Sequence, residues 1–130
     1  MTIRMLLAGA AALALLAAPA FAEDYVGGAV KTSEIGGKTV LTDANGMTLY
    51  TFDKDTAGVS NCYDDCATKW PPAFADAAAT AEGDFTIVDR TDGTKIWAYK
   101  GMPLYLWFKD AKAGDTTGDG VGGVWHTAVE

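Results

Sequence analysis

The decapeptide GMTLYTFDKD at residues 46–55 recurs in altered form as GMPLYLWFKD at residues 101–110. Six of the ten positions are identical at an offset of 55 residues, and a seventh position is aromatic in both copies. The same offset pairs Trp70 with Trp125. We therefore interpret the chain as two copies of one unit of about 55 residues. Two copies are too few for a solenoid, so we expect them to pack on one another within a single domain.

Each copy predicts a β-hairpin, because a turn signal separates two runs of β-prone residues. The turn is Asn45-Gly46 in the first copy and Lys100-Gly101 in the second. A short helix or turn containing the cysteines is expected at residues 62–70, where Pro71-Pro72 would end it. The sequence predicts an all-β or mainly β domain and leaves a sandwich and a small barrel open. The expected strands are residues 26–32, 40–42, 49–52, 85–89, 95–99, 104–108 and 124–129.

The first 22 residues have the pattern of a secretory signal peptide. Arg4 precedes an apolar run at residues 5–18, and the small residues Ala20 and Ala22 end the segment. The run is shorter than the roughly 18 to 20 residues that cross a bilayer. We expect cleavage after Ala22, which leaves residues 23–130 as a single duplicated domain.

The expected mature chain starts without a cysteine, so we expect neither a lipid anchor nor a membrane span in it. We predict an exported protein, located in the periplasm or outside the cell. The formal net charge is -7 at pH 7. An acidic chain repels a phosphate backbone, and we therefore expect no nucleic-acid partner.

An aromatic motif followed by an aspartate is present in both copies. It comprises Tyr50, Phe52 and Asp55 in the first copy, and Tyr105, Trp107 and Asp110 in the second. With the segments at residues 62–72 and 114–125, these motifs resemble the bacterial secreted-repeat proteins named for a Tyr-x-(Phe/Trp/Tyr)-x-x-Asp motif, many of which look lipid-anchored. The resemblance covers about residues 35–129. It implies an envelope location and a duplicated domain, and it implies no established activity.

Cys62 and Cys66 are expected to form a disulfide, because exported proteins enter an oxidising compartment. The loop between them is short, so the chain-entropy model assigns the bridge only about 2 kcal/mol. An exchange catalyst would favour a Cys-x-x-Cys spacing, which differs from the spacing here. We therefore interpret the pair as structural.

The motifs of common enzymes are missing from the sequence. It contains one histidine, His126, and has neither a Gly-x-Ser-x-Gly nor a His-Glu-x-x-His motif. We predict a protein that is not an enzyme and that needs no cofactor. Asp55 and Asp110 are instead expected to cap turns, as in the turn-like sequence of residues 55–58.

Our first hypothesis for function is a non-enzymatic envelope protein that binds an unidentified partner or small ligand through an aromatic-rich β surface. The alternative is a periplasmic metal-binding protein that uses His126 with Met47, Met102 or aspartate ligands, since imidazole and thioether suit Cu(I). A third hypothesis is a structural repeat without any ligand. Exposed side chains at Tyr50, Tyr105, Trp97 and Trp107 would favour the first hypothesis, and their burial would favour the third.

The leader sequence predicts that the mature protein starts at Glu23 and carries no acyl group. The reason is that the small-x-small site ends at Ala22 and no cysteine follows it. Intact-mass measurement of the exported protein should give the mass of unmodified residues 23–130. The mass of an uncleaved or acylated chain would contradict the prediction.

Overall fold

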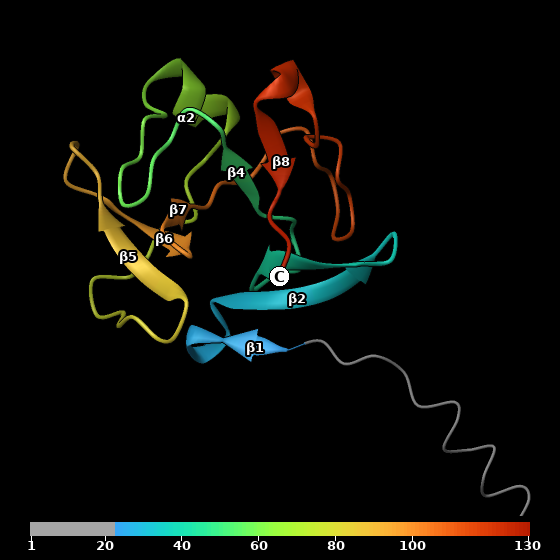
Figure 1. The fold of residues 1–130 in the computed structure, drawn as a ribbon, viewed down its shortest axis with the longest axis horizontal. Coiled ribbons are helices and arrows are strands. Elements are labelled where there is room, and N and C mark those ends of the chain that lie inside the picture. Colours follow the sequence, from blue (N-terminus) through green and yellow to red (C-terminus); the bar gives the residue numbers. More distant parts are fainter. Residues whose placement is uncertain (1–22) are drawn as a thin grey trace, which may run out of the picture.

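A computed structural model describes residues 23–130, and the predicted leader lies outside this part of the chain. Short strands dominate the described residues, together with one short α-helix and two 3-10 segments (Figure 1). The elements are β1 (Asp24–Tyr25), η1 (Val26–Gly28), β2 (Val30–Ile35), β3 (Lys38–Asp43), β4 (Tyr50–Phe52), α2 (Asp65–Lys69), β5 (Phe85–Asp89), β6 (Lys95–Tyr99), β7 (Met102–Pro103), η2 (Val121–Gly123) and β8 (Trp125–Thr127).

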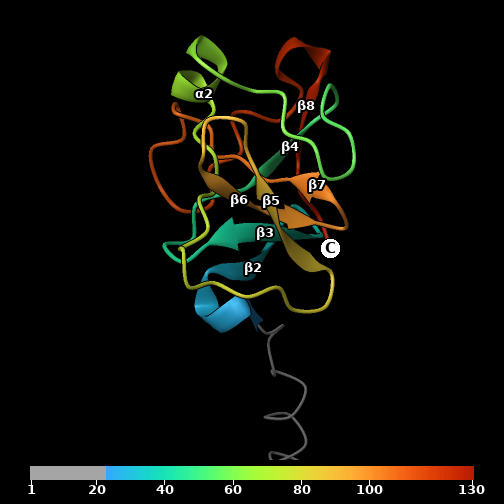
Figure 2. The same cartoon turned by 90° about the vertical axis from the view of Figure 1, so that its left-hand side faces the viewer.

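The described strands form three small antiparallel sheets and close no barrel. The first sheet has the order β1-β2-β3, the second pairs β4 with β8, and the third has the order β5-β6-β7. Figure 2 shows α2 and the segment before β8 at one end of the molecule and β1 at the other. The prediction of a mainly β fold with a short helix beside the cysteines is confirmed.

Both predicted hairpin turns are present. Lys100 and Gly101 have φ angles of 51° and 88°, and they join β6 to β7. A two-residue hairpin turn with two positive φ angles matches the right-handed twist of its strands, and glycine adopts such angles without strain. In the first copy, Gly46 has a φ angle of 83° in the loop that returns from β3.

Two expected strands differ most from the structure. The strand expected at residues 26–32 begins only at Val30, because Gly27 and Gly28 have φ angles of 72° and 93° that interrupt an extended chain. The strand expected at residues 104–108 is not a regular element, since its residues bond in turn to β6, to β4 and to the segment before Ala73.

The end of the second repeat pairs with the first repeat. Strand β8 lies antiparallel to β4, as Figure 1 shows. Beyond β8, the amide of Ala128 donates to the carbonyl of Leu49, and the amide of Leu41 donates to the carbonyl of Ala128, both at 2.8 Å.

The end of the first repeat mirrors this arrangement against the second repeat. The amide of Ala73 donates to the carbonyl of Leu104, and the amide of Trp97 donates to the carbonyl of Ala73, both at 2.9 Å. Ala73 and Ala128 differ by the repeat offset of 55 residues. The two repeats therefore exchange their terminal segments, and neither repeat contains all the strands of its own half.

The two repeats meet at Tyr50 and Tyr105, which form an antiparallel bridge. The amide of Tyr50 donates to the carbonyl of Tyr105 at 2.7 Å, and the reverse bond measures 2.9 Å. Because each residue bonds to its own counterpart, the approximate two-fold axis of the duplication passes through this bridge.

The exchange predicts that neither repeat folds by itself. A fragment of residues 23–79 lacks the segment that completes β3 and β4. A fragment of residues 80–130 lacks the segment at Ala73 that bonds to β6, and it lacks the strand β4 that pairs with β8. Each fragment alone should give the far-UV circular dichroism of an unfolded chain. An equimolar mixture should recover the near-UV signal of the intact domain. A cooperative thermal transition in either isolated fragment would contradict the exchanged arrangement.

Candidate functional site

Four aromatic rings stack across the two-fold axis. Trp70 and Trp125 lie at the centre, with ring centroids 3.7 Å apart and planes inclined by 2°. Phe52 stacks on Trp125 at 4.2 Å, and its counterpart Trp107 lies against Trp70 at 4.0 Å. Gly118 faces this stack, and a Cβ atom there would lie 2.9 Å from both Trp70 and Trp107. The motif aromatics therefore form the core between the repeats.

The tyrosine of each motif donates a hydrogen bond to the aspartate of the other motif. The Tyr50 hydroxyl donates to Asp110 Oδ2 at 2.6 Å, and the Tyr105 hydroxyl donates to Asp55 Oδ2 at 2.7 Å. All four residues are buried. The motif that defines each repeat is thus completed only by the other repeat.

The second oxygen of each aspartate accepts bonds from a following loop. Asp55 Oδ1 accepts from the amide of Asn61 at 2.7 Å, and Asp110 Oδ1 accepts from the amide of Thr117 at 3.0 Å. The predicted capping within residues 55–58 is wrong, because the tight turn runs from residue 56 to residue 59 and the donor lies beyond it. The aspartates hold longer loops, and they also join the repeats.

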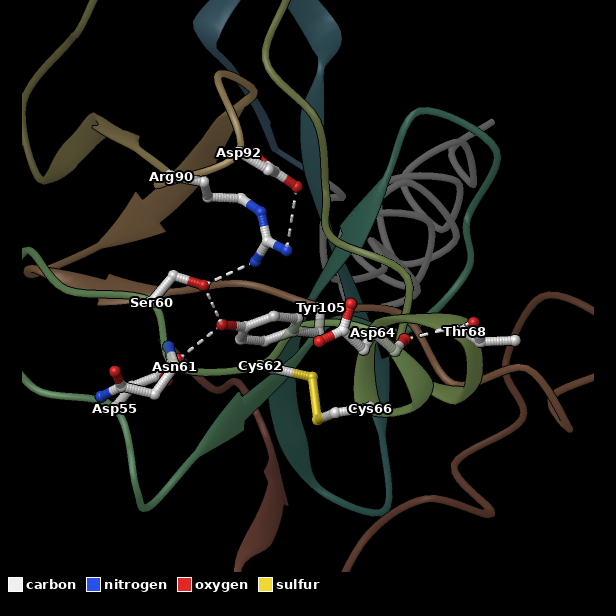
Figure 3. Close-up of a disulfide and its surroundings, with 10 residues drawn as sticks. All are labelled: Asp55, Ser60, Asn61, Cys62, Asp64, Cys66, Thr68, Arg90, Asp92 and Tyr105. Atoms are coloured by element: carbon white, nitrogen blue, oxygen red, sulfur yellow. Dashed lines mark hydrogen bonds and ion pairs between the residues drawn. A yellow bond between two sulfur atoms is a disulfide. The ribbon is translucent and has the colours of Figure 1, made fainter.

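A buried polar chain extends the pair of Tyr105 and Asp55, as Figure 3 shows. Ser60 Oγ lies 2.6 Å from the Tyr105 hydroxyl, and Arg90 Nη1 donates to Ser60 Oγ at 2.7 Å. Arg90 is only 5% exposed, and its Nε also donates to Thr94 Oγ1 at 3.1 Å. Two hydroxyl groups therefore connect the buried guanidinium to the buried carboxylate of Asp55.

Burial sets the protonation of this chain. It raises the pKa of Asp55 above its ordinary value, although the bonds from Tyr105 and Asn61 and the charge of Arg90 act in the opposite direction. Burial also raises the pKa of Tyr105, so its hydroxyl remains a donor at neutral pH. Ser60, Tyr105 and Asp55 are each at most 4% exposed, and they direct their hydrogen bonds at one another. This arrangement joins segments of the fold and presents no open position to a substrate.

The predicted disulfide is present between Cys62 and Cys66, whose Cα atoms lie 5.2 Å apart. Cys62 is fully buried in the aromatic core, and Cys66 packs against that core. The bridge joins the loop that carries Ser60 to the helix α2 (Figure 3). It fixes the loop on which the buried polar chain depends.

His126 and the two methionines occupy different parts of the fold. His126 is exposed on β8, and its Nε2 lies 2.8 Å from Asp53 Oδ2. Met47 follows the turn after β3, whereas Met102 is in β7. Among residues 23–130, no three His, Cys, Asp or Glu side chains gather in the manner of a metal site. His126 thus contacts an aspartate, which is one of the ligand types in the metal hypothesis.

The aromatic residues that would form an exposed β surface are mostly interior. Tyr50 and Tyr105 are fully buried and Trp97 is 4% exposed, whereas Trp107 is half-buried. Phe108, at the end of the strand expected at residues 104–108, is 52% exposed. Three of these four side chains are thus buried, which favours the structural-repeat hypothesis over binding through them. An aromatic binding surface would consist of other residues.

Another row of rings lines an open pocket of about 360 Å³. Phe85 is its central ring, with Tyr25 at 4.9 Å and Tyr99 at 5.0 Å between centroids. Tyr25 and Tyr99 are both half-buried, so part of each ring faces the pocket. The lining residues are Tyr25, Glu82, Gly83, Asp84, Phe85, Tyr99 and Glu130.

The sequence interpretation missed this pocket, because its residues come from β1, from the connection between the repeats, from β5 and β6, and from residue 130. Their separation along the chain hides their proximity. A weak signal was present, since Tyr25 is an aromatic residue in an otherwise acidic start, and acidic residues also precede Phe85.

A family model described as a secreted repeat of unknown function matches residues 29–74 and again residues 86–129. The chain belongs to this family of secreted repeats and contains two copies of the repeat. The family description supports export of the protein. No curated protein and no solved structure matches the chain. Within residues 23–130, no helix has the length and apolar character to cross a membrane.

We call the hydrogen bonds from each motif tyrosine to the aspartate of the other motif the crossed Tyr–Asp bonds. They predict that Tyr105→Phe lowers the free energy of unfolding in a pH-dependent way. Because burial places the folded-state pKa of Asp55 above its unfolded value, its stabilising contribution is present at low pH and is lost as pH rises through that folded pKa. Removing the Tyr105 hydroxyl raises the folded pKa further, since the bond that lowers it is gone. We expect a loss of about 1–3 kcal/mol near neutral pH and a smaller loss near pH 4.

Urea unfolding at both pH values measures this difference. Tyr99→Phe is the matched control, because Tyr99 lies outside the crossed pairs and is half-buried. Equal destabilisation by Tyr105→Phe at the two pH values would show that the bond to the ionised carboxylate of Asp55 contributes little.

Proposed function

We propose that this protein is a non-enzymatic exported binding domain whose ligand site is the aromatic pocket formed by Tyr25, Phe85 and Tyr99. The proposal keeps the aromatic β surface expected from the sequence and assigns it to rings outside the two motifs. An envelope location in the periplasm or at the cell exterior belongs to the same proposal. The family description as a secreted repeat supports this location at the level of export.

The contrast between the buried polar chain and the open pocket carries the proposal. The side chains with catalytic potential, such as Ser60 and Asp55, are buried and bonded to neighbouring side chains. The pocket, by contrast, combines the half-buried rings of Tyr25 and Tyr99 with carboxylates in a volume of about 360 Å³. Small-molecule sites typically combine an aromatic lining with a few polar groups and start at volumes of about 300 Å³.

The second candidate is a metal-binding protein, and the contact between His126 and Asp53 favours it. An imidazole and a carboxylate at 2.8 Å could share one exposed metal ion. Titration with Cu²⁺ or Zn²⁺ tests this candidate. Saturable binding that is lost in His126→Ala would favour it over the pocket.

Ligand titrations followed by heteronuclear NMR test the proposed site. The probes are tetramethylammonium, benzoate and phenol, which offer a cation, an anion and a neutral ring of small size. We expect at least one probe to shift the amides of Phe85 and Tyr99 saturably, and Tyr99→Leu to abolish that shift. Phe74→Leu is the matched control, because Phe74 is an exposed aromatic residue that does not line the pocket.

Two results would overturn the proposal. One is the absence of saturable shifts at Phe85 and Tyr99 with all three probes. The other is a probe response that Phe74→Leu removes and Tyr99→Leu leaves unchanged, because the binding would then lie elsewhere on the surface.

A further inference from the structure

We propose that the aromatic pocket binds a small organic cation, of the class that carries a methylated ammonium group. This inference rests on the proposed function, since it names the ligand class of the same pocket. It follows from the ring arrangement, from the carboxylates around the rings, and from the position of the pocket outside the repeats.

Two rings of the pocket are open in part to a cation. Tyr25 and Tyr99 are half-buried, whereas Phe85 is buried between them, with centroids at 4.9 and 5.0 Å and planes inclined by 31° and 35°. A cation over an aromatic face is attracted by the negative charge of the ring face. One such contact already exists, because Lys100 Nζ lies 5.2 Å from the centroid of the Tyr99 ring.

Carboxylates surround the ring wall and lack cationic partners. Glu82, Asp84 and Glu130 line the pocket and are exposed, and none of them forms a salt bridge within residues 23–130. The Tyr25 hydroxyl lies within hydrogen-bond distance of both Glu130 and Glu23 and shares its one proton between them, and these contacts bring a fourth carboxylate to the rim. Each glutamate that bonds there uses one oxygen and keeps a second oxygen for a ligand. The pocket is therefore apolar in its wall and negative at its rim.

Charge complementarity selects the ligand. A negative rim repels anions and attracts cations, and the aromatic wall favours a cation with an apolar surface over a strongly hydrated one. A methylated ammonium has such a surface, because methyl groups replace its hydrogen-bond donors. A zwitterion with its own carboxylate should bind less well, since the rim would repel that group.

Most residues that line the pocket lie outside the two matched repeats. The matched repeats span residues 29–74 and 86–129, and of the lining residues only Tyr99 falls inside these ranges. The counterpart of Phe85 in the first repeat is Val30, which has no ring. The duplication therefore supplies the framework, and the added segments supply the pocket.

Binding of choline to residues 23–130, compared with two analogues, tests the inference. The first analogue is dimethylbutanol, the uncharged isostere in which carbon replaces the nitrogen. The second is glycine betaine, which keeps the quaternary ammonium and adds a carboxylate. We expect choline to bind in the millimolar range, about tenfold more tightly than dimethylbutanol, with betaine in between. Added salt should weaken choline binding, because the rim is exposed.

Variants that remove one negative charge test whether the carboxylates of the rim attract choline. Asp84→Asn keeps the shape of the rim and should weaken choline binding several-fold, whereas its effect on dimethylbutanol should be negligible. Asp65→Asn is the matched control, because Asp65 is an exposed aspartate in α2 that does not line the pocket. Tyr99→Leu should abolish binding of choline.

The outcomes separate the two proposals. Equal binding of choline and dimethylbutanol, lost in Tyr99→Leu, would overturn the cation inference and leave the pocket as a binding site. Binding of benzoate without binding of choline would have the same meaning. If choline fails to bind, the cation inference is wrong. If tetramethylammonium, benzoate and phenol fail as well, the proposed function is wrong too.

Discussion

A buried carboxylate needs hydrogen-bond donors. In this domain, one donor to each buried aspartate of the motif comes from the other repeat. Asp55 and Asp110 each receive a tyrosine hydroxyl from the other repeat, at 2.7 and 2.6 Å. Leaving either carboxylate buried without that donor would cost about 1–3 kcal/mol. Two such bonds, related by the two-fold axis, therefore couple the repeats through the residues that define the motif. The exchange of terminal segments and the stack of Trp70 on Trp125 reinforce the same coupling.

Much of the fold could be predicted, because the duplication is recorded in the sequence itself. The offset of 55 residues identified the equivalent positions, and Gly46 and Gly101 marked the hairpin turns where positive φ angles are required. Export to an oxidising compartment predicted the disulfide between Cys62 and Cys66. These features depend on local sequence or on spacing, which a single chain reveals.

The missing parts depend on contacts between distant residues. The motif places a tyrosine five residues before an aspartate, and this spacing does not say whether the two bond within one repeat or across two. For the same reason, the sequence did not reveal the hydrogen bond between Arg90 and Ser60, which are 30 residues apart. It also hid the pocket, where Tyr25 and Glu130 meet although 105 residues separate them. Aromatic residues that looked suitable for a surface proved to be the core, because the two repeats bury their motifs against each other.

The core and the proposed pocket draw on different parts of the chain. The crossed Tyr–Asp bonds and the aromatic stack use the repeat residues fully, and these residues are closed to ligands. The pocket draws on β1 and on the connection between the repeats, which the core does not constrain in the same way. A ligand at the proposed pocket would therefore leave the packing between the repeats undisturbed.

Native-state hydrogen exchange is the most direct test of the central claim that the repeats form one cooperative unit. The amides of Tyr50 and Tyr105 donate to each other's carbonyl groups, and those of Leu41 and Trp97 donate to the exchanged segments. All four should exchange with one free energy, equal to the free energy of global unfolding. A markedly lower free energy for the amides of one repeat, with the other repeat still protected, would show that the repeats unfold separately and would contradict the account.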